Sequence, residues 1–214
     1  MKRRLVIVGA GGFGREVHSW VNTSPEWIAK TEIASIVFVD DRLPQIPVHA
    51  PVISTLQDYV PDATDLVVCA IGSPVVRRKV VEMLNAKNAQ IVSFVHDRAI
   101  VGHNVVMGVG VVVCPNALLS SDVRIGEHVH INTGCAIGHD VVVGDFVTLS
   151  GGCQLTGNVS VESDVFLSVA VSVIPGKRIG AGSLVGAGSV VLKDVPVGVT
   201  VFGNPSVIIG KRPE

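Results

Sequence analysis

A six-residue hydrophobic period runs through the second half of the chain, from about Val95 to Val197. A second small or branched side chain, such as Val129 or Cys153, follows most of these hydrophobic positions after four residues. The positions in between are rich in Gly, Asn, Asp and Ser. A repeat of this length is the signature of a parallel β-helix. The aliphatic position keeps its phase throughout: Val95, Val101, Met107, Val113, Leu119, Ile125, Ile131, Ile137, Val143, Leu149, Leu155, Val161, Leu167, Val173, Ile179, Val185, Val191 and Val197.

The physics of a solenoid explains this pattern. Each hexad supplies a short strand and a turn, and its aliphatic side chain fills the axis. The turns need positive φ or a close backbone approach, which Gly, Asn and Asp tolerate. One coil cannot bury its own apolar face, so coils must stack. The unbroken phase argues against the alternative, a Val- and Gly-rich sandwich that matches the period by chance.

The first 94 residues have a different pattern, which predicts a small α/β domain. An apolar strand at Leu5–Val8 leads into a glycine loop and a helix from about Arg15 to Asn22, and Pro25 closes that region. Strands are expected at residues 35–39, 65–72 and 91–95, with a helix from Pro74 to about Lys87. We therefore predict a Rossmann-like domain at residues 1–94 and a solenoid domain with a C-terminal tail at residues 95–214.

The glycine loop is the first candidate binding site. Gly9, Gly11 and Gly14 match G-x-G-x-x-G between a strand and a helix, where backbone N–H groups can meet a phosphate. Asp40 and Asp41 end the next strand, about where an acidic residue would meet a ribose hydroxyl. Such loops also serve simple close packing. A nicotinamide dehydrogenase is disfavoured because the domain is short and a solenoid follows it.

Composition and charge narrow the choice of partners. The 214 residues carry a formal net charge of −1, which gives no reason to expect nucleic acid. Mean hydropathy is high at +0.52, but no apolar run approaches the roughly 18 residues of a spanning helix, so no membrane insertion is expected. The four cysteines lack paired or metal-ligand spacing. We expect a cytoplasmic protein without a metal.

His139 and Asp140 are the candidate catalytic pair within the solenoid. A neutral imidazole with a pKa near its ordinary value of ~6.5 is the usual general base at pH 7, and an adjacent carboxylate can orient it. The alternative is that His139 is one more solvated turn residue, since His103 and His128 are equally placed to be turn residues.

The whole chain resembles the sugar acetyltransferases of the NeuD/PglD type, which acetylate sialic acid or a 4-amino sugar carried on a nucleotide. Several motifs carry the resemblance together: Gly9–Gly14, Phe38–Asp41, Ala70–Ser73, Asn132 with Gly138–Asp140, Gly144–Phe146, Gly157–Asn158, Gly186–Asp194 and Val201–Pro205.

The resemblance implies a left-handed β-helix, a homotrimer, acetyl-CoA as co-substrate between neighbouring solenoids, and a nucleotide-linked amino sugar on the N-terminal domain. It implies that His139 is the catalytic base, that Asp140 is its acidic neighbour and that the backbone N–H of Gly157 receives the thioester carbonyl. Thr148 stands where bacillosamine-type members carry a second histidine. The implied acetyl-CoA contacts are Thr148, Gly157, Gly186, Gly188 and Pro205, and the implied nucleotide-sugar contacts are Gly9, Gly11, Gly12, Phe13, Gly14, Asp40, Asp41, Gly72 and Ser73.

Several functions are compatible with these residues. The favoured one is an acetyl-CoA-dependent N-acetyltransferase acting on the amino group, expected to be the 4-amino group, of a nucleotide-linked sugar. An O-acetyltransferase acting on sialic acid or another hydroxyl acceptor is the second. A non-enzymatic nucleotide-sugar-binding solenoid is the third. A metal-dependent hydratase would need several histidines converging on one metal across subunits, and the spacing of His103, His128 and His139 leaves that open.

Overall fold

The computed structural model describes residues 2–42 and 48–212. The chain divides into two compact units, Met1–Asp97 and Arg98–Glu214. Each unit has its own architecture and its own set of buried apolar side chains.

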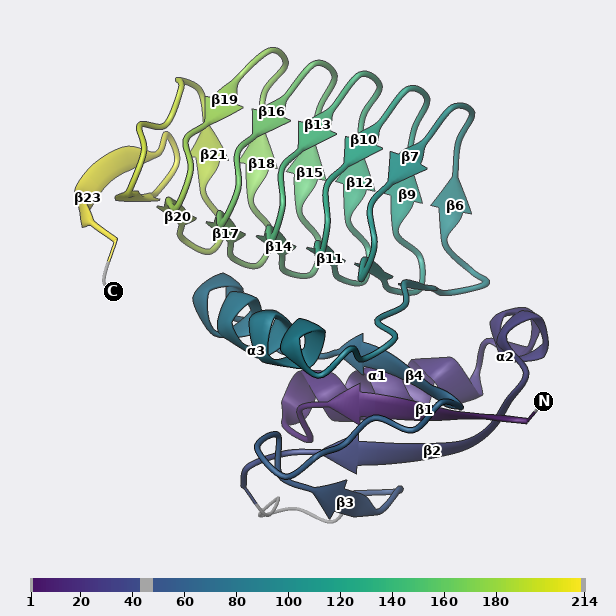
Figure 1. Ribbon diagram of the computed structural model, residues 1–214. Helices are drawn as coiled ribbons and strands as arrows, with labels where there is room; N and C mark the ends of the chain where they lie inside the picture. The colour runs from purple at the N-terminus through teal and green to yellow at the C-terminus, as the bar shows by residue number, and fades with distance from the viewer. Residues whose placement is uncertain (1, 43–47, 213–214) are drawn as a thin grey trace. The chain divides into compact units, whose positions relative to one another are not determined.

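The first unit is built on a parallel sheet with the strand order β3-β2-β1-β4 (Figure 1). The central strand β1 is buried from Leu5 to Val8, as expected of a parallel strand covered on both faces. The elements of this unit are β1 (Arg3–Val8), α1 (Gly12–Asn22), α2 (Pro25–Thr31), β2 (Ile33–Val39), β3 (Val52–Ser54), β4 (Asp65–Cys69), α3 (Pro74–Ala86) and β5 (Phe94–Val95).

Several sequence-based expectations for this unit were wrong in detail. The strand expected at residues 65–72 ends at Cys69, as β4. Helix α1 begins at Gly12 rather than Arg15, because Gly11 is its extended N-cap residue. Pro25 does not end a helical region but starts α2, since proline is favoured in the first turn of a helix. The strand expected at residues 91–95 is reduced to β5 and an isolated bridge from Ile91 to Val67. Strand β3 was not predicted at all.

A buried carboxylate links the neighbouring strands β1 and β4 near the start of each. Asp65 on β4 receives two hydrogen bonds from the Arg4 guanidinium, at 2.7 and 2.9 Å, and one from the Tyr59 hydroxyl at 2.9 Å. Burial raises the pKa of Asp65, but its hydrogen bonds to Arg4, to the backbone of Asp62 and to Tyr59 outweigh this and hold the pKa below its ordinary value. The carboxylate therefore stabilises the fold in its charged form.

The second unit is a solenoid whose strands are two residues long (Figure 1). Residues eighteen positions apart pair in parallel, as in Arg124 with Val142 and Val142 with Ser160, so three hexads make one coil. The strands are β6 (Ile100–Val101), β7 (Val106–Met107), β8 (Val112–Val113), β9 (Leu118–Leu119), β10 (Arg124–Ile125), β11 (His130–Ile131), β12 (Ala136–Ile137), β13 (Val142–Val143), β14 (Thr148–Leu149), β15 (Gln154–Leu155), β16 (Ser160–Val161), β17 (Phe166–Leu167), β18 (Ser172–Val173), β19 (Arg178–Ile179), β20 (Leu184–Val185) and β21 (Val190–Val191).

Stacking these coils forms three sheets. Their orders are β19-β16-β13-β10-β7, β21-β18-β15-β12-β9-β6 and, for the third, β20-β17-β14-β11-β8. A hairpin of β22 (Val199–Phe202) and β23 (Val207–Lys211) continues the third sheet beyond β20. The predicted polar turns adopt the expected left-handed backbone at positions such as Asn116, Asp122 and Asn158.

The hexad positions form the solenoid core, as the period predicts. Leu119, Ile131, Ile137 and most of their equivalents are almost completely buried. The expectation fails at the ends, where Val101 is 41% exposed and Val197 62% exposed. A hexad side chain is buried by the coil stacked on each side of it, and the terminal positions lack one of these neighbours. No helix in residues 2–42 and 48–212 is long and apolar enough to cross a membrane.

The Asp65 network generates a pH-dependent prediction. Asp65→Asn should lower the free energy of unfolding by about 2 kcal/mol at pH 7, because the variant leaves Arg4 and Tyr59 without their charged acceptor. Because the folded-state pKa of Asp65 is depressed, the wild-type advantage is present above the unfolded-state pKa and is lost as pH falls through the folded-state pKa. Urea denaturation at pH 7 and at about pH 3 measures both effects. The exposed Glu82→Gln is the control, and a difference that grows in acid would contradict the prediction.

Candidate active site

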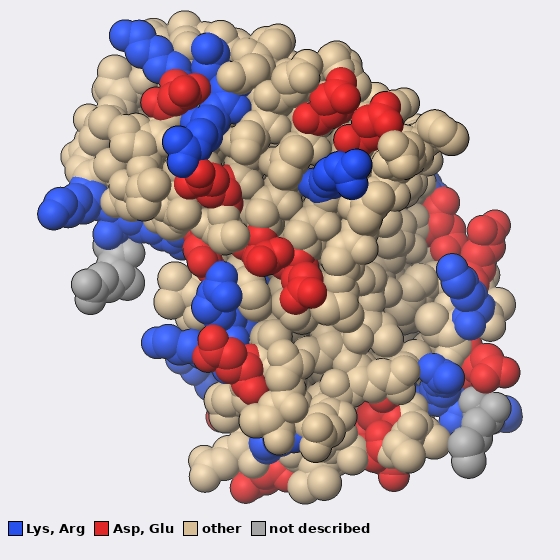
Figure 2. All heavy atoms as spheres, turned by 45° about the horizontal axis from the view of Figure 1, so that its top comes forward, with Lys and Arg blue, Asp and Glu red and all other residues tan. Residues whose placement is uncertain are grey.

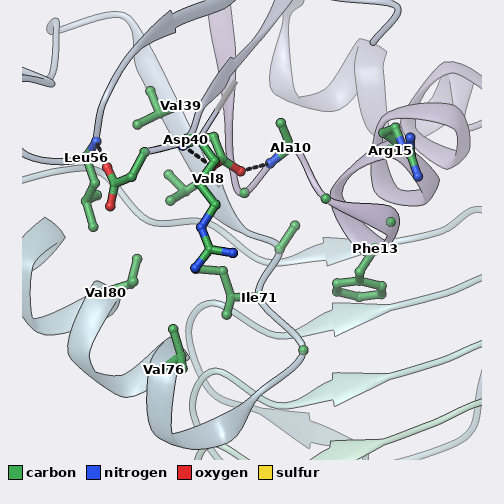
Figure 3. Close-up of a pocket in the computed structure, with 17 residues that line it drawn as sticks. Val8, Ala10, Phe13, Arg15, Val39, Asp40, Leu56, Ile71, Val76 and Val80 are labelled. Atoms are coloured by element: carbon green, nitrogen blue, oxygen red, sulfur yellow. Dashed lines mark hydrogen bonds between the residues drawn. The ribbon is translucent and has the colours of Figure 1, made fainter. Parts of the chain in front are cut away.

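The first candidate site is a cavity of about 720 Å³ in the first unit (Figure 3). It lies where β1, β2 and β4 end and α1 begins, which is the usual ligand position in an open parallel sheet. Val76 and Val80 contribute to its wall from α3. The loop that follows β4 adds Ala70, Ile71 and Gly72.

The glycines of the loop have two different roles. A side chain at Gly14 would place its Cβ 1.8 Å from the carbonyl oxygen of Gly9, so this position keeps α1 packed on the loop. Gly9 itself has φ +101° and lies close to Ala70. Gly11 and Gly12 face open space, since a Cβ at either position would have no described atom within 4 Å beyond its chain neighbours. The backbone N–H groups at this end of α1 can therefore be approached by an anionic ligand.

Asp40 and Asp41 both line the cavity, but their carboxylates are partly used by the protein. Asp40 accepts hydrogen bonds from the backbone N–H of Ala10 at 2.6 Å and of Arg42 at 2.8 Å (Figure 3). Asp41 Oδ1 accepts the N–H of Leu56 at 2.7 Å. Within residues 2–42 and 48–212, no protein partner bonds to Oδ2 of Asp41. Asp40 thus holds the glycine loop, whereas Asp41 uses only one of its two oxygens within the described part of the chain.

Not all of the remaining predicted residues line the cavity. Phe13 and Gly72 line the cavity. Ser73 does not: it is the exposed N-cap residue of α3, and its hydroxyl accepts the N–H of Val76 at 3.5 Å. Sequence reasoning missed two cationic lining residues, Arg15 and Arg42. Their positions directly after the glycine loop and after the Asp40–Asp41 pair were a usable signal.

The second candidate site is a turn of the solenoid between β12 and β13. His139 Nδ1 lies 2.8 Å from Asp140 Oδ2, and both side chains are more than half exposed, at 61% and 55%. Asp140 has φ +58°, the left-handed conformation that the repeat imposes on this turn position. The carboxylate is thereby fixed at one nitrogen of the imidazole, and solvent can reach the ring. An imidazole held in this way can serve as an oriented general base.

Gly157 lies directly under the His139 ring, one coil later in the chain. A Cβ at position 157 would stand 2.5 Å from His139 Nε2 and 2.5 Å from Cε1, so only glycine leaves room for the imidazole. The N–H of Gly157 donates to no residue in the described part of the chain. The structure therefore brings together three of the predicted residues: His139, Asp140 and Gly157.

The other predicted acetyl-CoA contacts lie elsewhere on the solenoid. Gly186 and Gly188 are in the turn that precedes β21, whereas the His139 turn follows β12, so the two turns lie at opposite edges of the sheet that contains both strands. Gly188 faces open space, whereas Gly186 packs against the ring of Phe202. Pro205 follows β22, and the adjacent Ser206 N–H bonds to Val190. Thr148 is only 2% exposed on β14, in a different sheet from β12.

Acidic and basic side chains are interspersed on the face drawn in Figure 2. In the described ranges, no group of three or more His, Cys, Asp or Glu side chains could hold a metal ion. All four cysteines are described, buried and free of disulfides, and burial raises the pKa of Cys69 to about 12.

Comparisons with known proteins agree with both halves of the fold. Residues 4–84 match the family model of the PglD N-terminal domain. The structure superposes on PerB from Caulobacter crescentus, solved with CoA and GDP-perosamine, with a TM-score of 0.83 and 32% identity over 96% of this chain and 97% of that one. The chain belongs to the NeuD/PglD-type sugar acetyltransferase family. The predicted resemblance and the predicted fold class, a Rossmann-like domain followed by a left-handed β-helix, are confirmed.

Two further relatives of this NeuD/PglD-type protein are a second sugar-acetyltransferase structure and a galactoside O-acetyltransferase. The acetyltransferase domain of PglB from Neisseria gonorrhoeae, solved with acetyl coenzyme A, matches with a TM-score of 0.87 and 29% identity over 98% of this chain and all of that one. A galactoside O-acetyltransferase from Lactococcus lactis is 35% identical over 109 residues, which is 50% of this chain. The match spans about half the length of that relative, 53%.

The two classes of glycine in the loop can be tested as a matched pair. Gly14→Ala should lower the melting temperature by several degrees, because its Cβ cannot coexist with the Gly9 carbonyl in this packing. Gly12→Ala adds the same methyl group in open space, at the first residue of α1, and should not lower the melting temperature. Thermal unfolding followed by circular dichroism measures both. Equal melting temperatures for the two variants would show that the loop does not pack as described.

Proposed function

We propose that this protein is an acetyl-CoA-dependent N-acetyltransferase that acts on the amino group, specifically the 4-amino group, of a nucleotide-linked sugar. The observation that carries the proposal is the His139–Asp140 pair seated over Gly157. The N-terminal cavity supports the nucleotide part of the substrate. The relatives support the substrate class, since PerB was solved with CoA and GDP-perosamine and the PglB domain with acetyl coenzyme A.

The proposed reaction needs no covalent enzyme intermediate. The sugar amine attacks the thioester carbonyl of acetyl-CoA, and Nε2 of His139 accepts the amine proton. Asp140 holds Nδ1–H, which keeps the imidazole in the tautomer that can accept at Nε2 and stabilises the imidazolium. The carbon–sulfur bond then breaks, the amide forms, and the leaving thiolate takes the proton from the imidazolium.

Gly157 supplies the candidate oxyanion donor. Gly157 lies beside the imidazole, and its N–H has no acceptor in the described part of the chain, so it is free to bond to the carbonyl oxygen as negative charge develops. Loss of one such donor costs roughly 2.7–4 kcal/mol of transition-state stabilisation in other enzymes. The absence of a side chain at position 157 also makes room for the His139 ring.

The N-terminal cavity provides matching groups for a nucleoside diphosphate. The exposed backbone at Gly11 and Gly12 and the side chain of Arg15 are suited to the phosphates. The unused oxygen of Asp41 is suited to a ribose hydroxyl.

Coenzyme A is assigned to the solenoid. The open glycine Gly188 and the tail near Pro205 are the remaining predicted contacts with suitable exposure, and a homotrimer would let a neighbouring solenoid complete that site. Thr148 and Gly186 are weaker candidates for contacts with coenzyme A. Thr148 is buried, and Gly186 packs on the ring of Phe202.

O-acetylation is the second candidate. The observation that favours it is the match to a galactoside O-acetyltransferase over half of this chain. The acceptor distinguishes the two reactions. Release of CoA thiol should be followed with UDP-, GDP- and dTDP-linked 4-amino sugars beside free sialic acid and galactosides. Turnover with an amino-sugar nucleotide supports N-acetylation, and turnover confined to hydroxyl acceptors would replace it with O-acetylation.

Removal of the candidate base should abolish most activity without unfolding the protein. His139→Ala is expected to reduce kcat by about 10²-fold or more, the contribution typical of a positioned general base. His103→Ala is the matched control, since His103 is also exposed in a solenoid turn but is followed by Asn104 rather than by an aspartate. Steady-state thiol release measures both variants. Wild-type turnover in His139→Ala would remove this residue from the mechanism.

The nucleotide assignment predicts a selective effect on one substrate. Asp41→Asn should raise the KM for the nucleotide sugar several-fold while the KM for acetyl-CoA stays near its wild-type value, because the two substrates are assigned to different units of the chain. Glu82→Gln, which changes an exposed carboxylate outside the cavity lining, serves as the control. Initial rates with each substrate varied in turn give both constants. A parallel rise in both KM values would contradict the assignment of the two substrates to different units of the chain.

A further inference from the structure

Two cationic side chains, one on helix α3 and one on its C-cap residue, bind backbone carbonyls of neighbouring loops. Arg77 Nη1 donates to the carbonyl oxygens of Ile71 at 2.7 Å and Gly72 at 3.2 Å. At the other end of the helix, Lys87 Nζ donates to the carbonyls of Leu56 at 2.7 Å, Gln57 at 2.6 Å and Tyr59 at 2.8 Å. An ammonium group has three N–H donors, and Lys87 uses all three in hydrogen bonds to this loop.

Both of these loops form walls of the N-terminal cavity. Ile71 and Gly72 line it on one side, and Leu56 lines it on another. Neither Arg77 nor Lys87 is itself among the described residues that line it. The cavity wall that comes from α3 itself is made by Val76 and Val80. A single helix therefore contributes one wall and fixes the backbone of two others.

Leu56 is held from two directions. Its carbonyl oxygen is bound by Lys87, and its N–H is bound by Asp41 Oδ1 at 2.7 Å. Asp41 is the carboxylate whose second oxygen is assigned to the substrate. A shift of the loop around Leu56 would therefore move a lining side chain and also change the orientation of this carboxylate.

The direction of the Lys87 side chain is not the one that helix chemistry alone would give. Lys87 is the C-cap residue of α3, where a lysine ordinarily interacts with the last carbonyls of its own helix. Its ammonium instead bonds to a loop some thirty residues earlier in the chain. Charge-assisted bonds of this kind are about twice as strong as neutral ones, so this arrangement favours one position of the loop.

We propose that Lys87, together with Arg77, is a positioning residue for the nucleotide part of the substrate, acting through the Leu56 and Ile71–Gly72 loops without touching the ligand. This inference rests on the proposed function, because it assigns the cavity to a nucleoside diphosphate. On this proposal, α3 and its C-cap residue hold the loops that form the nucleotide site in position.

The test compares three variants of lysines on or next to α3. Lys87→Met keeps the length of the side chain and removes every donor. Lys87→Arg keeps the charge and several donors. Lys79→Met is the matched control, because Lys79 is exposed on the same helix and, among the described residues, bonds to neither loop. Titration calorimetry with UDP, GDP and dTDP gives the dissociation constants, and steady-state kinetics give the KM of each substrate and kcat.

Lys87→Met is expected to weaken nucleotide binding roughly tenfold, which corresponds to losing about one charge-assisted hydrogen bond. The KM for the nucleotide sugar should rise in parallel, while kcat and the KM for acetyl-CoA stay within about twofold of wild type. Lys87→Arg should recover most of the affinity. Lys79→Met should bind like wild type.

The outcomes that overturn the inference are distinct from those that overturn the proposed function. Equal nucleotide affinity in wild type and Lys87→Met overturns the positioning role. A fall in kcat and a rise in both KM values, unrelieved in Lys87→Arg, would show a purely structural role and also overturn it. If wild type binds a nucleoside diphosphate but acetylates no amino-sugar nucleotide, the proposed activity fails while the affinity comparison still decides the inference. Wild type that binds no nucleoside diphosphate overturns both.

Discussion

Backbone pairing between residues eighteen positions apart is the constraint on which the solenoid and its candidate catalytic site depend. The register repeats from Arg124 to Val142 to Ser160, and every turn therefore lies on the equivalent turn of the next coil. Turn residues that are distant in sequence are brought into contact without any specific side-chain interaction. His139 lies over Gly157 because they occupy equivalent positions in successive coils.

This stacking also explains which residues the turns can contain. A Cβ at Gly138 would meet the Gly157 nitrogen at 2.8 Å, so the backbones of neighbouring coils approach too closely for a side chain there. The turn position of Asp140 requires positive φ, which aspartate tolerates better than most residues. The candidate catalytic pair thus fits positions where the repeat permits polar residues, and the geometry of the base costs the fold little.

The N-terminal site is assembled in a different way. Its backbone comes from loops that no repeat holds in place, and specific side chains fix each loop. Asp40 holds the glycine loop, Asp41 and Lys87 hold Leu56, and Arg77 holds Ile71 and Gly72. The same logic applies at α2, whose first N–H groups are capped by the distant carboxylate of Asp97. A cavity built this way depends on residues outside its lining.

The sequence by itself determined the solenoid and its length of repeat, because hexad period and turn chemistry are local properties that reappear in every coil. That recurrence cannot single out one turn, and it was the family resemblance that selected His139 and Asp140 among the polar turn residues. The sequence also located the glycine loop and the two aspartates at the ends of the first two strands. Tertiary structure alone decided that Asp40 is used by the protein, that Thr148 is buried away from the His139 turn, and that Lys87 reaches the cavity wall. These contacts join residues far apart in the chain with no periodic relation, so nothing in the local pattern specifies them.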